Sequence, residues 1–293
     1  MCPQNQRINL TLAQMGATWL LALAAIVPAT APAAPIAIVT DVQGKATITT
    51  DGRAVEATIA TEIEPGAQLQ LQASATLVLL YFEGAAEYAF RGPAQAVLRT
   101  AQPEMISGAA AVRRSPGAGP AIRIKPVGLG QGALVMRSSQ PGARIRLLSA
   151  SGTRVLENQP ELRWLEPHGG LTYQVEIADD TGRLLHEAQV AGAALRLPPG
   201  VQLKEGVSYS WAVSARLPDG RKYSSVGEFS VANAELRAQA AALRLAVDAS
   251  VSSRVAFALW LDQAELKDDA RKLWRMLAAE RPEDERLKAL AAR

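Results

Sequence analysis

Residues 75–82 read Ala75-Thr76-Leu77-Val78-Leu79-Leu80-Tyr81-Phe82, an almost continuous apolar run. A short apolar run bounded by turn residues indicates a buried β-strand. Glu83-Gly84 follows it directly, and Asp51-Gly52 upstream is a strong hairpin signal between two other strand-like runs. Turn residues recur at short intervals through this part of the chain, with no helical pattern between them. The first part of the chain is therefore predicted to be all-β.

The composition limits the kinds of site that the chain can hold. It has 293 residues, of which 48% are hydrophobic and 20% charged, enough for about two domains at about 150 residues each. The formal net charge of +3 is too small to indicate nucleic acid as a partner. One cysteine and two histidines are too few for a protein-ligated zinc site, an iron–sulfur cluster or a disulfide framework. We therefore expect no metal and no cofactor.

The N-terminus has the layout of a secretory signal peptide, with a basic start, a short apolar region and small residues at a cleavage site. Arg7 is the only charged residue before position 41, and an apolar stretch spans 17–27. Ala31-x-Ala33 then offers an Ala-x-Ala cleavage site. We expect residues 1–33 to be removed as a signal peptide.

An uncleaved membrane anchor is the alternative, because residues 16–39 are uncharged and long enough to span a bilayer. Three prolines interrupt this stretch beyond Val27, which favours cleavage. After cleavage we expect no stable membrane span.

A composition rich in alanine and arginine is typical of a GC-rich bacterial genome, so the exported chain is expected in the periplasm or at the cell surface. Export makes nucleic acid a still poorer partner.

Charge is distributed unevenly along the chain. Residues 34–104 carry eight acidic and four basic side chains, whereas residues 105–156 carry eight basic side chains and no acidic one. One interpretation is that the basic segment lies beside the acidic block in one domain and neutralises it. The other is an anion-facing strip for envelope polymers. The candidate strip consists of Arg113, Arg114, Arg123 and Lys125.

Three stretches of the first part resemble the FecR-like domain. Residues 39–48 resemble its opening, residues 63–71 its central turn-and-strand step, and residues 73–84 its last strands with an acidic-Gly turn. The sequence departs from the family at Ala67, where aspartate is usual. The resemblance implies a small β-roll or solenoid-like domain outside the cytoplasmic membrane, which we place at 34–140. We do not expect the signal-relay role of the founding regulators, because this sequence shows neither their cytoplasmic N-terminal domain nor a convincing membrane span.

The part that follows, residues 141–232, has the strand count of a β-sandwich. Leu203-x-x-Gly206-x-x-Tyr209 resembles the tyrosine corner of fibronectin type III and related domains, and Trp164 matches their buried tryptophan. The resemblance implies that the Tyr209 hydroxyl bonds back to the main chain. It implies recognition or spacing and no chemistry. Linker-like stretches at 115–120 and 128–132 precede this module.

The tail, residues 233–293, is predicted to be helical, with Asn233 as a cap and helices over 251–263 and 268–280. These two helices resemble one tetratricopeptide repeat. The matching positions are Ala258, Leu261, Leu266, Ala270, Trp274 and Pro282. One repeat cannot build a peptide-binding groove, for which about three are needed. We expect a helical hairpin that packs on its own sandwich or on a partner.

No motif for catalysis is present: there is no Walker loop, no Gly-x-Ser-x-Gly elbow and no His-Glu-x-x-His. His168 lies in a loop and His186 within a strand, and Asp179-Asp180 precedes Thr181-Gly182 as in a hairpin turn. No catalytic residue is predicted and no enzyme is expected. A glycosidase with two carboxylates far apart in sequence stays open, although such enzymes normally need a larger scaffold with an aromatic-lined cleft.

Together these patterns predict a mainly β protein with an α-helical C-terminal tail. We expect a non-enzymatic, exported cell-envelope protein that acts as an interaction or scaffold module. The alternative is a binding module for anionic glycan or peptidoglycan. The aromatic residues are few and fall at inward positions, which favours the first interpretation. The expected partner is an envelope protein or an anionic envelope polymer.

Overall fold

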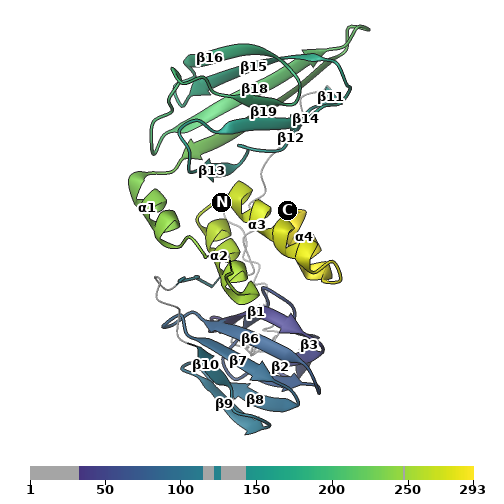
Figure 1. Cartoon of the computed structure of the whole chain (residues 1–293), viewed down its shortest axis with the longest axis vertical. Helices are drawn as coiled ribbons and strands as arrows, with labels where there is room; N and C mark the ends of the chain where they lie inside the picture. Colours follow the sequence, from purple (N-terminus) through teal and green to yellow (C-terminus); the bar gives the residue numbers. More distant parts are fainter. Residues whose placement is uncertain (1–32, 115–121, 127–142, 247) are drawn as a thin grey trace, which may run out of the picture. The chain divides into compact units, whose positions relative to one another are not determined.

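The computed structural model describes residues 33–114, 122–126, 143–246 and 248–293 (Figure 1). The predicted signal peptide and both linker-like stretches fall outside these residues, apart from Ala33 at the end of the signal. Contacts group Ala33–Arg293 into one compact unit, to which every element below belongs. The mainly β prediction is confirmed, with four sheets followed by four C-terminal helices.

The first two sheets are five-stranded and antiparallel, and we call them the first sheet pair. One contains, in spatial order, β10 (Val112–Arg114), β7 (Glu87–Arg91), β6 (Thr76–Tyr81), β1 (Ala37–Gln43) and β4 (Glu62–Ile63). The other contains β3 (Arg53–Glu56), β2 (Ala46–Thr50), β5 (Gln68–Leu71), β8 (Ala94–Leu98) and β9 (Pro103–Ser107). Within the described residues, neither sheet closes into a barrel or repeats as a solenoid.

Strand β6 is the apolar run with which the sequence analysis began, and it is buried on both faces. Successive side chains of a strand point to opposite faces. Leu77, Leu79 and Tyr81 are fully buried in the core that the two sheets share. Leu80 and its neighbour Ile38 on β1 belong instead to a second apolar cluster, formed with the helices. A strand covered on both sides reads as a continuous apolar run rather than an alternating one.

The remaining strands form a β-sandwich, which we call the second sheet pair. Its larger sheet contains β11 (Ala143–Arg144), β19 (Lys222–Val231), β18 (Ser208–Arg216), β15 (Thr172–Asp179) and β16 (Leu184–Ala191), with β13 (Thr153–Val155) pairing β19 in parallel. Its smaller sheet contains β12 (Arg146–Leu147), β14 (Glu161–Leu165) and β17 (Ala194–Arg196). Inward side chains of both sheets meet in a single core.

Trp164 lies in the middle of that core. It is 1% exposed, and its ring centroid lies 5.3 Å from that of Tyr173 and 6.2 Å from that of Trp211. The Trp211 indole donates a hydrogen bond to the carbonyl of Ala150 at 2.7 Å. Gly227 makes this possible, because a Cβ at that position would lie 2.7 Å from the Trp211 indole nitrogen.

The expected corner hydrogen bond is present. The backbone N–H of Lys204 donates to the Tyr209 hydroxyl at 2.7 Å, and Tyr209 is 4% exposed. Gly206 between them has φ +73°, a left-handed conformation that glycine adopts without strain. The phenol therefore ties the loop before β18 to the sandwich core.

Four helices follow the sheets: α1 (Ala234–Ala242), α2 (Val251–Gln263), α3 (Lys267–Glu280) and α4 (Glu285–Ala291). The side chains of Asn233, Ser250 and Asp284 cap α1, α2 and α4, as is usual for such residues. Helix α3 has no side-chain cap at its own N-cap residue, Leu266. Its cap comes from elsewhere in the chain, as described below.

The α2–α3 hairpin packs its apolar face on the first sheet pair. The repeat-like positions Ala258 and Ala270 are fully buried, and they share a cluster with Ile38, Ile59 and Leu80. The hairpin was expected on its own sandwich or on a partner. This expectation is wrong for the apolar face of the hairpin. Small residues on a helix indicate close packing, but they do not show which surface the helix packs against. The turn between α2 and α3, at Glu265, and the N-terminal end of α3 contact the second sheet pair.

The corner hydrogen bond can be tested by Tyr209→Phe. Removing the hydroxyl leaves the Lys204 N–H without its partner, and we expect a loss of about 1–3 kcal/mol in the free energy of unfolding. The matched control is Tyr223→Phe, because the half-buried Tyr223 hydroxyl bonds to none of the described residues. Urea unfolding of both variants measures the difference. Equal midpoints for Y209F and the parent would refute the corner.

Candidate functional site

The missing cap of α3 is supplied by Thr153 on β13. Its hydroxyl accepts hydrogen bonds from the backbone N–H groups of Lys267 at 3.0 Å and Asp268 at 3.4 Å. It also lies 3.1 Å from the carbonyl oxygen of Glu265, to which it can donate. The backbone N–H of Arg154 donates to the same carbonyl at 2.7 Å. A strand of the second sheet pair thus satisfies backbone groups at the start of α3 that the helix itself leaves without partners.

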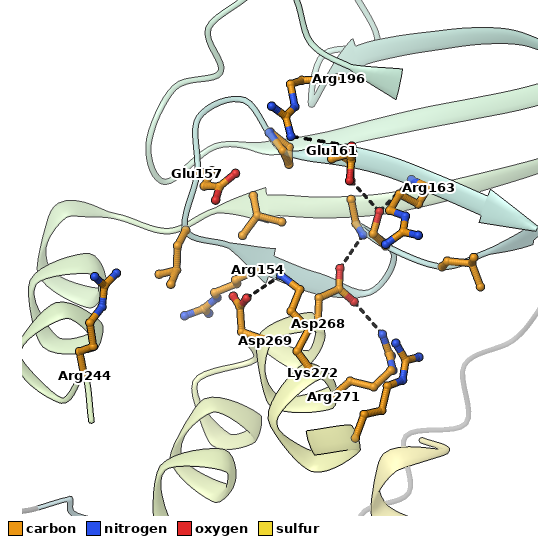
Figure 2. Close-up of a pocket in the computed structure, with 17 residues that line it drawn as sticks. Arg154, Glu157, Glu161, Arg163, Arg196, Arg244, Asp268, Asp269, Arg271 and Lys272 are labelled. Atoms are coloured by element: carbon orange, nitrogen blue, oxygen red, sulfur yellow. Dashed lines mark hydrogen bonds and ion pairs between the residues drawn. The ribbon is translucent and has the colours of Figure 1, made fainter. Parts of the chain in front are cut away.

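Asp268 makes the reciprocal contact from the helix. One carboxylate oxygen accepts from the backbone N–H of Ala150 at 2.7 Å, and the other from the Arg271 guanidinium at 2.8 Å (Figure 2). An acidic side chain in the first turn of a helix is favourable there, because the helix N-terminus carries partial positive charge. These contacts hold the loop before β13 against α3.

A cleft of about 460 Å³ opens beside this junction, and we call it the basic cleft. It is bounded by β13, β14, the residues that follow α1, and the exposed side of α3. Figure 2 shows that most of its charged side chains come from these separate elements. Its charged lining residues are Arg154, Glu157, Glu161, Arg163, Arg196, Arg244, Asp268, Asp269, Arg271, Lys272 and Arg275.

Part of this charge is neutralised within the described residues. The ion pairs there are Arg196–Glu161 at 3.9 Å, Arg271–Asp268 at 2.8 Å, Lys272–Asp269 at 3.1 Å and Arg154–Glu265 at 3.2 Å. The exposed side chains of Arg163, Arg244 and Arg275 have no acidic partner in the described part of the chain. The cleft therefore carries uncompensated positive charge, which acts over about 8 Å at physiological salt.

A second hollow, of about 680 Å³, adjoins the basic cleft, and we call it the apolar groove. The two share Leu156, Arg244, Asp269 and Lys272 as lining residues. The apolar side chains of the groove are Leu156, Ala240, Ala241, Leu245, Ala246, Phe257, Leu261, Leu273 and Met276. The groove thus lies among α1, α2 and α3, with the charged cleft at one end.

One ion pair borders the apolar groove. The Arg254 guanidinium donates two hydrogen bonds to the Glu280 carboxylate, at 2.5 and 2.7 Å. These bonds lower the pKa of Glu280 and raise that of Arg254, so both groups stay charged and paired. Glu280 therefore does not supply a free negative charge to the groove.

The candidate strip lies away from both hollows. Arg113 and Arg114 belong to the edge strand β10, and Arg123 and Lys125 lie in the separate segment 122–126. All four side chains are exposed, and none bonds to a described side chain. Strand β10 does lie beside β7 of the acidic first part, with Arg114 opposite Glu87. Nevertheless, Glu87 accepts a hydrogen bond from Ser252 and forms no ion pair in the described residues.

The other polar residues considered in the sequence analysis lie in a loop, in an edge strand and in a hairpin turn. His168 is exposed in a loop, its ring centroid 5.9 Å from that of Tyr223, and His186 is half-buried in the edge strand β16. Asp179 accepts from the Thr181 hydroxyl at 2.6 Å and closes its hairpin, and that hydrogen bond lowers the Asp179 pKa. Within the described ranges no three His, Cys, Asp or Glu side chains gather to hold a metal.

The residues of the basic cleft were not identified from the sequence, apart from Arg154 as one member of the basic segment. Arg163, Arg244 and Arg275 come from β14, the stretch after α1 and α3, in a part of the chain where acidic and basic residues alternate. Their acidic neighbours pair with other cations in space. Linear charge counting cannot separate paired from unpaired arginines, so no signal in the sequence pointed to this surface.

Comparisons with known proteins identify no family. No family model matches the chain, and no curated protein does. Among solved structures, one match is CopC from Methylosinus trichosporium OB3b, at 24% identity, covering 31% of this chain and 95% of that one. Its TM-score is 0.24, which is too low to carry a conclusion about this chain. In the described part of the chain, no helix is both long and apolar enough to cross a membrane.

The capping contact can be tested by Thr153→Val, which keeps the shape of the side chain and removes its hydroxyl. We expect a loss of about 0.5–2 kcal/mol in the free energy of unfolding, because the first turn of α3 loses its cap. Thr153→Ser, which retains the hydroxyl, should lose less. Thr172→Val on the exposed face of β15 is the matched control. If T153V and T172V cost the same in urea unfolding, β13 does not cap α3.

Proposed function

We propose that this chain is a non-enzymatic, exported protein of the cell envelope that acts as an interaction or scaffold module. In this proposal the first sheet pair is a FecR-like domain, the second a fibronectin type III-like sandwich, and the α2–α3 hairpin a tetratricopeptide-like unit. Removal of the signal peptide leaves the protein in the periplasm or at the cell surface. Its partner is an envelope protein.

The observation that carries this proposal is that the helical hairpin contacts both sheet pairs. Arg281 on the C-terminal side of α3 pairs with Asp41 at 2.7 Å, and both side chains are at least four-fifths buried. Ser252 of α2 lies 2.8 Å from the Thr40 hydroxyl. The other end of the hairpin receives the Thr153 cap. In this chain one helical hairpin contacts both sheet pairs. A protein built in this way is suited to presenting surfaces to partners.

Further polar contacts support the same role. The side-chain amide of Gln263 at the end of α2 exchanges two hydrogen bonds with the backbone of Lys125, at 2.5 and 2.8 Å. The Arg286 guanidinium donates to the carbonyl of Ile59 at 3.2 Å, and its burial lowers its pKa. These bonds use backbone groups of loops, so they fix where the loops lie against the helices.

Binding of an anionic glycan or peptidoglycan is the second candidate. Four exposed cations without described partners, Arg113, Arg114, Arg123 and Lys125, favour it. Contacts of this kind position a polyanion without specifying its sequence, and salt weakens them.

One experiment separates the two candidates. The mature protein and its R113Q/R114Q/R123Q/K125Q variant are immobilised and offered either solubilised envelope proteins or purified peptidoglycan, at low and high salt. We expect both to retain the same envelope protein, and only the parent to retain peptidoglycan, weakly and at low salt alone. If the folded parent retains no envelope protein at either salt concentration, the scaffold role is refuted. If its peptidoglycan binding resists salt or survives in the variant, the strip is not a polyanion site.

A further inference from the structure

The apolar groove offers surface that a carbohydrate polymer or an inorganic anion would leave uncovered. Met276 is 54% exposed, and Leu245 and Phe257 are half-buried along the same hollow. The ring of Phe257 stacks on that of Trp260, with centroids 5.8 Å apart and planes inclined by 10°. Phe257 is therefore held in place by a neighbouring ring. A ligand with aliphatic side chains can bury this surface.

The charge at the end of the groove favours an acidic ligand. The cleft carboxylates Glu161, Asp268 and Asp269 already pair with cations, as does Glu280 at the other side of the groove. A basic ligand would find a free carboxylate only at Glu157 among the described lining residues. An acidic ligand would find three free guanidinium groups, and arginine pairs with carboxylates through two parallel hydrogen bonds.

The two hollows form one surface, because Arg244, Leu156, Asp269 and Lys272 line both. Arg244, from the stretch after α1, lines both hollows. Volumes of about 460 and 680 Å³ are in the range of specific ligand sites, roughly 300–1,000 Å³. A ligand that spans both must be apolar at one part and anionic at another.

We propose that the basic cleft and the apolar groove together bind an acidic, amphipathic segment of a partner polypeptide. Its apolar side chains, spaced at i, i+3 and i+4 on a short helix, lie in the groove against Phe257 and Met276. Its carboxylates reach Arg163, Arg244 and Arg275 in the cleft. The inference rests on the proposed role as an interaction protein, and it specifies the chemistry of the partner.

The test uses a fluorescein-labelled synthetic peptide of leucine and glutamate, with leucine at the helical spacing above and glutamate elsewhere. Fluorescence anisotropy at physiological salt measures its affinity for the mature full-length protein. We expect the R163Q/R244Q/R275Q variant to bind about tenfold or more weakly, because it loses three charge-assisted contacts. The matched control is R53Q/R91Q/R216Q, which removes three exposed cations outside both hollows and outside the candidate strip and should bind as the parent does.

A second variant tests the groove separately from the charge. Met276→Glu places a carboxylate on an exposed position of α3, so the fold should persist, and we expect roughly tenfold weaker binding. Circular dichroism and urea unfolding check that each variant is folded. A peptide with serine in place of leucine should bind much more weakly than the parent peptide, and one with lysine in place of glutamate should not bind.

Each contrary result overturns the inference. Equal binding of the serine and leucine peptides would mean that the cleft takes polyanions of any kind. The same conclusion would follow if heparin fully displaced the leucine peptide and also bound the M276E variant. Binding of the lysine peptide would overturn the charge argument. No binding of the leucine peptide by the folded parent would refute the peptide site alone, since the scaffold role is judged by retention of an envelope protein.

Discussion

Burial of β6 on both faces is the constraint on which the remaining arrangement depends. One face of the strand is covered by the partner sheet of the first pair. The other face, with Leu80 and the adjacent Ile38, is covered by the α2–α3 hairpin. Without the hairpin these side chains would be exposed to water, at a cost of roughly 1.5–3 kcal/mol for each large aliphatic side chain. The helical tail is therefore an integral part of the fold of the first sheet pair.

The same hairpin determines where the candidate site lies. Its far end is capped by Thr153 and held by Asp268, which brings one edge of the second sheet pair against α3. The basic cleft opens at this junction, and the apolar groove adjoins it, lined in part by Phe257 and Met276 of α2 and α3. The hairpin thus covers the first sheet pair and also lines the hollow in which we propose that a ligand binds.

The sequence predicted local structure well where local chemistry decides it. Asn233 caps α1 as expected, and the helix expected over 251–263 forms at Val251–Gln263. Asp51-Gly52 joins the β2–β3 hairpin. What the sequence could not supply was long-range pairing. Thr153 and Lys267 are far apart in the chain, and nothing in either residue type indicates that one caps the helix begun by the other.

The candidate site shows the same limit. The inward positions of Trp164 and Tyr209 follow from alternation and a known corner pattern, and both lie buried. The cations at 113, 114, 123 and 125 are exposed, but they occupy two separate segments rather than one element. The uncompensated arginines of the cleft depend on which carboxylates are taken up by other cations, and this is decided only by the folded chain.

Hydrogen exchange of the mature protein in increasing urea, followed by mass spectrometry, tests the dependence of β6 on the hairpin most directly. Exchange reports the free energy at which each segment opens. If the hairpin completes the first sheet pair, peptides from β6 and from α2–α3 lose protection at the same urea concentration. If α2 and α3 exchange at lower urea while β6 stays protected up to the global transition, the strand does not need its helical cover and the account is contradicted.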